Sequence, residues 1–226
     1  MSVKSKMTAI ADAIREKTGG TDPLTLDAMA EAIAGIEAGG GGGEADYSME
    51  DNIVTDSLTE YRNPRVTKLG RYVFYFSNIK KHTFDAVLTT DVGPFRESSV
   101  VTANFPELVT AGEDMFLRCY SLANVSMPKV KELKNWSFEY CRELVFLDFP
   151  CLEKIGANVF YGSALETLII RTNNVCALGN TNSFNKACNV YVPQALISEY
   201  QQATNWSSLY ADGTLNFVAI EGSEYE

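Results

Sequence analysis

The sequence contains one histidine and no Cys-x-x-Cys pair, so it lacks the residue spacing of common metal sites. The cysteines are odd in number, and we expect buried free thiols that act as small apolar residues. They are Cys119, Cys141, Cys151, Cys176 and Cys188. His82 lies in the polar stretch 80–83, where we predict a solvated loop residue and not a catalytic base. The glycine run at 39–43 also lacks the Lys-Ser/Thr of a phosphate loop, so we expect a non-enzymatic protein without metal or cofactor.

Long apolar stretches and basic clusters are missing as well. No segment approaches the roughly 20 apolar residues of a membrane span, so no membrane insertion is expected. The formal net charge is −10 and no basic cluster exceeds Lys80-Lys81, which argues against a nucleic-acid partner. Charge interrupts residues 1–12 too early for a secretory signal, so we expect no classical export.

Residues 1–38 have the apolar spacing of two amphipathic helices separated by Gly19-Gly20. The positions expected on their apolar faces are Val3, Met7, Ile10, Ile14, Leu26, Met29 and Ile33. A hairpin of this size buries too little core to be stable alone, so we predict an anchor or oligomerisation module that packs on a partner or on another copy. Residues 39–46 follow as a Gly-rich flexible linker.

The remaining chain repeats. Pro106, Pro128 and Pro150 recur at intervals of 22 residues, each after a large apolar residue. Two further apolar positions recur with the same spacing. One is occupied by Leu108, Val130 and Leu152, and the other by Phe116, Phe138 and Phe160. The stretch 84–104 carries a badly eroded copy. A leucine-rich period in this range predicts an α+β solenoid of leucine-rich repeats with one short strand per unit, and phenylalanines that form a core spine.

The predicted solenoid and its cap span residues 47–211, and 212–226 is expected to supply a closing strand and a frayed acidic tail. Helical spacing at Ile197, Tyr200 and Ala203, followed by Trp206, indicates an end piece that covers the last open core.

The repeat resembles the BspA-type leucine-rich repeat. Phe116–Leu122 and Phe138–Leu144 match the Phe-x-x-Cys-x-x-Leu core of that motif, and Val190–Pro193 resembles the usual end of such arrays. Met115, Ser137 and Val159 depart from the Ala/Thr that the motif places before its Phe. The resemblance covers about residues 60–210 and implies a repeat fold used for binding.

A second resemblance concerns the start of the chain. Ile10–Gly19 and Leu24–Ile33 look like the beginning of phage and prophage tail proteins, in which a helical hairpin and a Gly-rich linker precede a variable distal domain. This resemblance implies a non-catalytic tail-fibre or baseplate-associated protein, located in the virion tail and assembled in the host cytoplasm. Its N-terminal helices would contact other tail or baseplate proteins, and its repeats would contact a host-surface protein or glycan as a homo-oligomer.

Two other functions stay open, and a glycan-cleaving tail enzyme is a further, minor alternative. The chain could be a BspA-like adhesin or interaction protein at the bacterial cell surface, or a structural decoration of the baseplate. In each case the expected contact surface is the exposed face of the repeat strands, whose side chains alternate with the core. Its predicted members are Thr102, Asn104, Asn124, Ser126, Phe146, Asp148, Thr167, Ile169, Asn189 and Tyr191. Phe146 and Ile169 are large apolar groups, which favours an interface, although the chain itself or another copy could cover this face.

Overall fold

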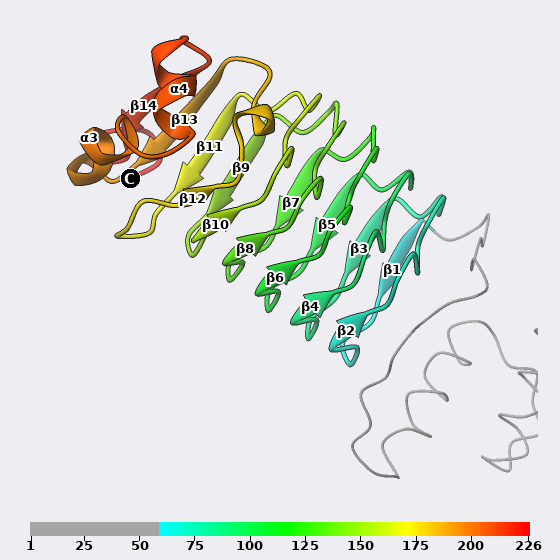
Figure 1. The fold of residues 1–226 in the computed structure, drawn as a ribbon. Coiled ribbons are helices and arrows are strands. Elements are labelled where there is room, and N and C mark those ends of the chain that lie inside the picture. The colour runs from blue at the N-terminus through cyan, green and yellow to red at the C-terminus, as the bar shows by residue number, and fades with distance from the viewer. Residues whose placement is uncertain (1–58) are drawn as a thin grey trace, which may run out of the picture. The chain divides into compact units, whose positions relative to one another are not determined.

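The computed structural model describes residues 59–226, and the predicted helical hairpin and linker lie outside them. Within this range the chain winds through six turns of a solenoid, each contributing a longer strand followed by a two-residue strand (Figure 1). The strand pairs are β1 (Glu60–Arg62) and β2 (Lys68–Leu69), β3 (Lys81–Thr83) and β4 (Thr89–Thr90), β5 (Thr102–Asn104) and β6 (Thr110–Ala111), β7 (Asn124–Ser126) and β8 (Glu132–Leu133), β9 (Phe146–Phe149) and β10 (Lys154–Ile155), and β11 (Thr167–Ile170) and β12 (Ala177–Leu178). The predicted leucine-rich-repeat solenoid is confirmed.

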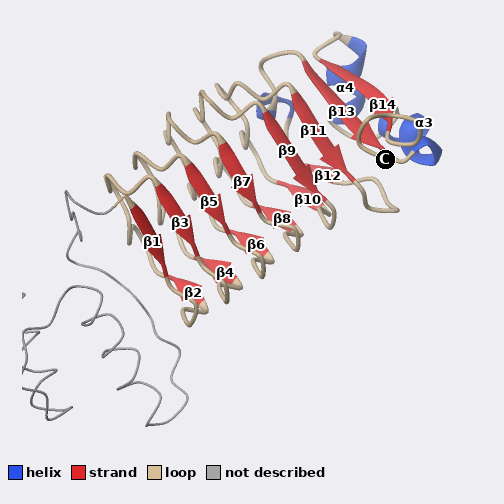
Figure 2. Cartoon of the chain, turned by 180° about the vertical axis from the view of Figure 1, so that it is seen from behind, coloured by secondary structure: helices blue, strands red, loops and turns tan. Residues whose placement is uncertain are grey.

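All strand pairing in the described chain is parallel and joins successive turns. The longer strands form two sheets in the orders β1-β3-β5-β7 and β9-β11-β13-β14, while the short strands form one sheet in the order β2 to β12 (Figure 2). The prediction of one strand per unit was therefore wrong. The residues after each repeat proline also pair with the neighbouring turn, as in the bond from the Lys131 amide to the Val109 carbonyl at 2.8 Å.

The eroded stretch 84–104 forms a regular turn. Its key apolar residues Phe84, Val87, Phe95 and Val100 are all fully buried. The backbone bonds between turns do not depend on side-chain identity, and the Phe84 amide donates to the Asn104 carbonyl at 3.0 Å. Burial and backbone pairing thus keep the turn intact where the sequence motif is lost.

A ladder of phenylalanine rings runs through the core. Successive ring centroids lie 5.2 to 5.9 Å apart along Phe74, Phe95, Phe116, Phe138, Phe160 and Phe184. These distances suit offset stacking, so each ring packs on its equivalents in the adjacent turns. The predicted core spine is confirmed, and the rings are not available as a surface platform.

Left-handed residues bend the chain around this ladder. They lie two positions before and two positions after the core phenylalanine, as at Asp114 and Arg118 around Phe116. Most are not glycine, so the turn accepts a conformation that costs ordinary residues free energy. Gly162 occupies the second of these positions after Phe160, and a Cβ there would come within 2.4 Å of the Tyr140 ring. Glycine at this site therefore avoids a steric clash as well as the cost of the left-handed conformation.

The C-terminal end of the solenoid is covered by a cap. After β13 (Cys188–Val192) come η2 (Gln194–Leu196), α3 (Ile197–Tyr200) and α4 (Trp206–Ala211), and β14 (Leu215–Ala219) then pairs with β13; a further short helix, η1 (Thr181–Ser183), lies before β13. Tyr200 and Trp206 are fully buried. The Trp206 Nε1 donates to the Cys176 carbonyl at 2.6 Å, and the Tyr200 hydroxyl accepts from the Cys176 amide at 2.9 Å. The cap thus closes the core that the sequence predicted it would cover.

The prediction for His82 was wrong. The residue is on β3 and points into the core, fully buried, against the rings of Phe74, Phe84 and Phe95. Neither imidazole nitrogen has a hydrogen-bond partner of regular geometry. Burial lowers its pKa to about 3, and the Ile79 carbonyl opposes only part of this shift. The polar neighbours in the sequence misled the prediction because side chains alternate on a strand and only every second one faces solvent.

The cysteines agree with the prediction at four positions. Cys119, Cys141, Cys176 and Cys188 are buried free thiols, and Cys151 is half-buried. Burial raises the pKa of Cys119 to about 12, so this thiol is neutral and unreactive.

Candidate interaction surface

The longer strands present two rows of outward side chains, which we call the outer face. Strand pairing aligns the first row as Glu60, Lys81, Thr102 and Asn124 on one sheet and Phe146, Thr167, Asn189 and Asn216 on the other. The second row is Arg62, Thr83, Asn104 and Ser126, then Asp148, Ile169, Tyr191 and Val218. The structure therefore brings all ten predicted surface residues onto one face.

The centre of the outer face is polar and uncharged. Asn124 and Ser126 are exposed, and Thr102 and Asn104 are half-buried. Within residues 59–226, no hydrogen bond or ion pair engages any of these four side chains. Their hydroxyl and amide groups can therefore both donate and accept hydrogen bonds to a partner.

Ion pairs flank this polar centre. Arg171 makes a two-pronged contact with Asp148, with nitrogen–oxygen distances of 2.9 to 3.2 Å. Arg62 pairs in the same way with Asp85 at 2.9 and 3.1 Å. Asp148 is thus already occupied by a cation, so it is a poorer candidate for ligand contact than the unpaired groups beside it.

The outer face changes character at β9. Phe146 is 42% exposed, which agrees with its predicted role as an outward apolar residue. Ile169 points outward too, yet it is fully buried and lies outside the continuous core. The prediction that Ile169 is exposed was wrong, because residues 221–226 fold back over this part of the sheet and are not a frayed tail. The alternative that the chain itself covers the face is correct at this position.

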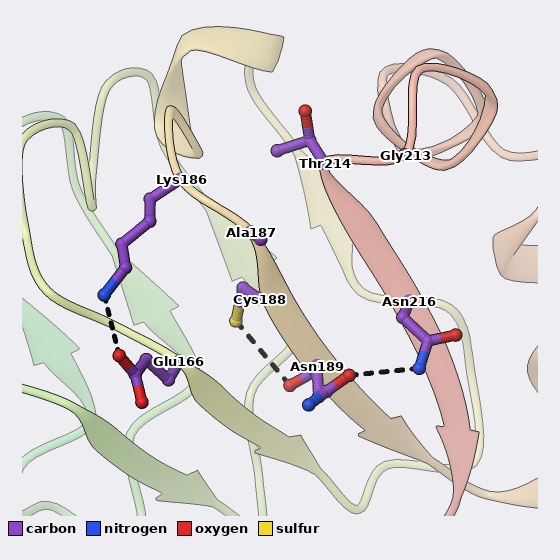
Figure 3. Close-up of a pocket in the computed structure, with 8 residues that line it drawn as sticks. All are labelled: Glu166, Lys186, Ala187, Cys188, Asn189, Gly213, Thr214 and Asn216. Atoms are coloured by element: carbon purple, nitrogen blue, oxygen red, sulfur yellow. Dashed lines mark hydrogen bonds and ion pairs between the residues drawn. The ribbon is translucent and has the colours of Figure 1, made fainter.

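A shallow groove lies at the amino-terminal ends of β11, β13 and β14, beside the outer face (Figure 3). It encloses about 340 Å³. Lys186 pairs with Glu166 at 2.8 Å, and the Asn216 amide donates to the Asn189 side chain at 3.0 Å. The polar groups of the groove therefore satisfy one another, which leaves little unmet hydrogen-bonding capacity for a ligand.

Sequence reasoning missed a set of exposed aromatic residues in the turn segments. Phe76, Tyr120, Trp136 and Tyr161 are each 37 to 52% exposed. Tyr161 packs edge-on against Tyr140 with centroids 5.7 Å apart, and Arg142 lies 4.9 Å from the centroid of the Tyr120 ring. Their place one to four residues before or after the core phenylalanine was the available signal. It was obscured because no single repeat position carries an aromatic residue in every turn.

Two classes of feature are absent from the described range. Across residues 59–226, no group of three or more His, Cys, Asp or Glu side chains is arranged to hold a metal ion. Over the same residues, no helix is both long and apolar enough to cross a lipid bilayer.

Comparison with known proteins supports the fold and its family. The model of the BspA type leucine-rich repeat region matches residues 67–191 with six copies. A leucine-rich repeat protein from Bacteroides ovatus ATCC 8483 has a similar structure, with a TM-score of 0.50 and 21% sequence identity. The match covers 73% of this chain and 43% of that protein, so the chain spans less than half of its length. No curated protein matches the chain. Because the family model covers more than half of the sequence, the chain belongs to the BspA-type leucine-rich-repeat family.

Proposed function

We propose that this protein is an adhesin-type interaction protein that binds a protein or glycan surface through the outer face of its solenoid. The observation that carries the proposal is the polar centre of that face, where Thr102, Asn104, Asn124 and Ser126 have no partner within the described chain. Stacked turns hold the backbone of these residues at fixed spacing, so little backbone entropy is lost when a partner binds. Membership in the BspA-type repeat family agrees with a binding role. We place this binding at the bacterial cell surface.

The flanking residues support contact with a macromolecule rather than with a small ligand. The polar centre lies beside the exposed ring of Phe146, and an aromatic residue next to hydroxyl and amide groups is a common composition of binding surfaces. The face is open and extends over several turns. Small-molecule sites are mostly clefts or cavities, whereas this face consists of outward side chains on parallel strands.

A matched pair of lysine substitutions tests this proposal. Ser126→Lys adds a charge and a long side chain to the polar centre, and Thr89→Lys makes a comparable change at an exposed strand position on the short-strand sheet. Binding of the fluorescently labelled full chain to bacterial and animal cells would be measured by flow cytometry. We expect Ser126→Lys to reduce binding at least tenfold (about 1.4 kcal/mol) and Thr89→Lys to leave it unchanged. Equal binding by both variants would reject the outer face as the contact surface.

A second candidate function is attachment of a phage virion to its host, with residues 1–38 docked to the tail. It is favoured by the resemblance of Ile10–Gly19 and Leu24–Ile33 to the start of phage tail proteins. Electron microscopy of particles decorated with an antibody against the repeat domain would test it. Labelled tail tips are expected, and particles that lack the protein altogether would exclude this location.

A further inference from the structure

One outward residue of the outer face is completely covered. Ile169 aligns with Asp148 on β9 and Tyr191 on β13 in the second outward row. Its neighbours in this row retain some exposure, but Ile169 retains none. Because it lies outside the continuous core, the groups that bury it come from the solvent side of the sheet.

Tyr225 lies over this position. Its ring centroid is 5.7 Å from that of Phe146 and 4.8 Å from that of Tyr191, and it meets the second ring edge-on. Phe146 belongs to the first row on β9 and Tyr191 to the second row on β13, so the line between them crosses β11. A ring in contact with both therefore lies above β11, where Thr167 and Ile169 point outward.

The segment that carries Tyr225 is held by few contacts. The Glu221 carboxylate accepts a hydrogen bond from the Gln194 amide at 2.9 Å. The Tyr225 hydroxyl also hydrogen-bonds the Thr167 side chain on β11. The remaining hydrogen bonds of residues 221–226 are local, such as those from the Ser223 hydroxyl to the Ile220 carbonyl at 2.7 Å and from the Gly222 amide to Glu226 at 3.0 Å. Both views place this end of the chain beside α3 (Figures 1 and 2). A preformed turn with two distal hydrogen bonds and one aromatic anchor can detach without disturbing the core.

We infer that the outer face of β9, β11 and β13 is a binding site for a tyrosine-bearing peptide turn, and that residues 221–226 occupy it in cis. Phe146, Ile169 and Tyr191 form the apolar seat for the tyrosine ring, and Thr167 is beside its hydroxyl. The segment serves as a gate, because a partner's tyrosine reaches the seat only after Tyr225 leaves it. This inference rests on the proposed function, since it assigns a ligand class and a regulation to part of the same outer face.

The chemistry of the seated segment defines the ligand class. The seat is apolar and ringed by aromatic edges, which favours a planar ring over an aliphatic side chain. The segment that occupies the seat carries three carboxylates close to its tyrosine in the sequence, namely Glu221, Glu224 and Glu226. A short acidic peptide with one tyrosine in a tight turn is therefore the expected partner.

A thiol at position 169 measures the gate directly. In a Cys151→Ser background the native thiols are all buried, so Ile169→Cys supplies the only thiol beneath the segment. Ser126→Cys gives an exposed reference on the same outward row. We expect Ile169→Cys to react about 10- to 100-fold more slowly than Ser126→Cys, with the ratio giving the fraction of open molecules.

Two changes should remove this protection without unfolding the chain. Deletion of residues 221–226 and the single substitution Tyr225→Ala are both expected to bring the labelling rate of Ile169→Cys close to that of Ser126→Cys. Tyr225→Phe, which keeps the ring that contacts Phe146 and Tyr191, should retain most of the protection. Continued protection of the native thiol Cys119 verifies that each variant is folded. Equal rates for Ile169→Cys in all chains would overturn the inference, as would labelling as slow as that of Cys119 in the intact chain, since the segment would then never open.

A synthetic peptide tests the ligand class. The peptide Ala-Ile-Glu-Gly-Ser-Glu-Tyr-Glu repeats residues 219–226, and it should slow Ile169→Cys labelling in the chain that lacks residues 221–226. A tether supplies an effective concentration on the order of 1 mM. Since the tethered segment protects the thiol about 10- to 100-fold, the free peptide should half-protect it at about 0.01 to 0.1 mM. The same peptide with alanine in place of tyrosine should give none, and protection by both peptides or by neither would overturn the inference. The two hypotheses fail separately. If Ser126→Lys abolishes cell binding while Ile169→Cys labels at the same rate with and without residues 221–226, the proposed function stands and only this inference fails.

Discussion

The turns that contain β1 to β8 and those that contain β9 to β14 follow one repeat but differ on both sides of the main sheets. In the N-terminal turns the longer strands have three residues, their outer face is polar, and no described segment is seated on its centre. In the C-terminal turns these strands have four or five residues, their outer face includes Phe146 and Ile169, and residues 221–226 partly cover it. The inward side chains of the longer strands also become larger and more apolar. They are His82 and Ala103 in the N-terminal turns and Leu147 and Leu168 in the C-terminal turns.

This difference shows that the repeat specifies the register but leaves the use of each face open. A strand side chain points inward or outward by its position alone. Whether an outward position meets solvent depends on what else in the chain reaches it. The covered half gains apolar contacts, and the open half keeps groups that can bind a partner.

The largest effect is expected from the ring ladder that both halves share. Phe116→Ala and Phe160→Ala each remove a fully buried ring from between two others. Each should lower the free energy of unfolding by about 3 to 5 kcal/mol, measured by denaturant titration. A loss that is large in one half and below about 1 kcal/mol in the other would show that the halves unfold separately.

His82 distinguishes the N-terminal turns by its pH dependence. Its pKa in the folded chain, about 3, is below its ordinary value of 6.5, so the unfolded chain binds more protons between these values. The free energy of unfolding is therefore unaffected by His82 above pH 6.5 and decreases as the pH falls from 6.5 toward 3. At pH 5 the decrease is about 2 kcal/mol. His82→Leu introduces the residue found at the equivalent inward position of β9 and β11, and it should remove this part of the pH dependence. Identical pH profiles for the two chains would contradict the assignment.

Gly162 and Arg118 occupy the same left-handed position in the two halves, with φ of 67° and 58°. Gly162→Ala adds a Cβ within 2.4 Å of the Tyr140 ring, whereas Arg118 already carries a Cβ. We expect a loss of about 1 to 2 kcal/mol for Gly162→Ala in thermal unfolding, from the left-handed conformation and the displaced ring. Arg118→Ala should cost less than about 0.5 kcal/mol, because its contact with Glu97 is long and exposed. A loss for Gly162→Ala no larger than that for Arg118→Ala would contradict the steric role of Gly162.

The smallest effect is expected on the outer face itself. Ile169→Ser should cost about 1 kcal/mol, less than a core substitution, because residues 221–226 can detach instead of leaving a cavity. Ser126→Ala, in the same outward row of the open half, should change stability by less than about 0.5 kcal/mol. Thermal unfolding of both chains, with and without residues 221–226, measures this. In chains that lack residues 221–226, Ile169→Ser and Ser126→Ala should change the free energy of unfolding by similar amounts.

The sequence by itself determined the repeat, its register and the residues of the ring ladder. Proline, phenylalanine and leucine recur every 22 residues because the turns stack, and equivalent positions must bury equivalent groups in every turn. It also identified the cap residues Tyr200 and Trp206 and the outward rows of the face. It misplaced His82, because local polarity outweighed strand alternation in the prediction, and it missed the second strand of each turn, because two-residue strands leave no periodic signal.

Only the tertiary structure decided which outward residues are open. Ile169 and Ser126 occupy equivalent positions, and no local pattern distinguishes a covered isoleucine from an exposed one. The difference comes from Tyr225, which lies 56 residues further along the chain and reaches Phe146 and Tyr191 only after α3, α4 and β14 have brought the chain back. Periodic patterns record contacts between neighbouring turns, whereas this contact joins segments that have no shared period and is fixed by the path of the folded chain.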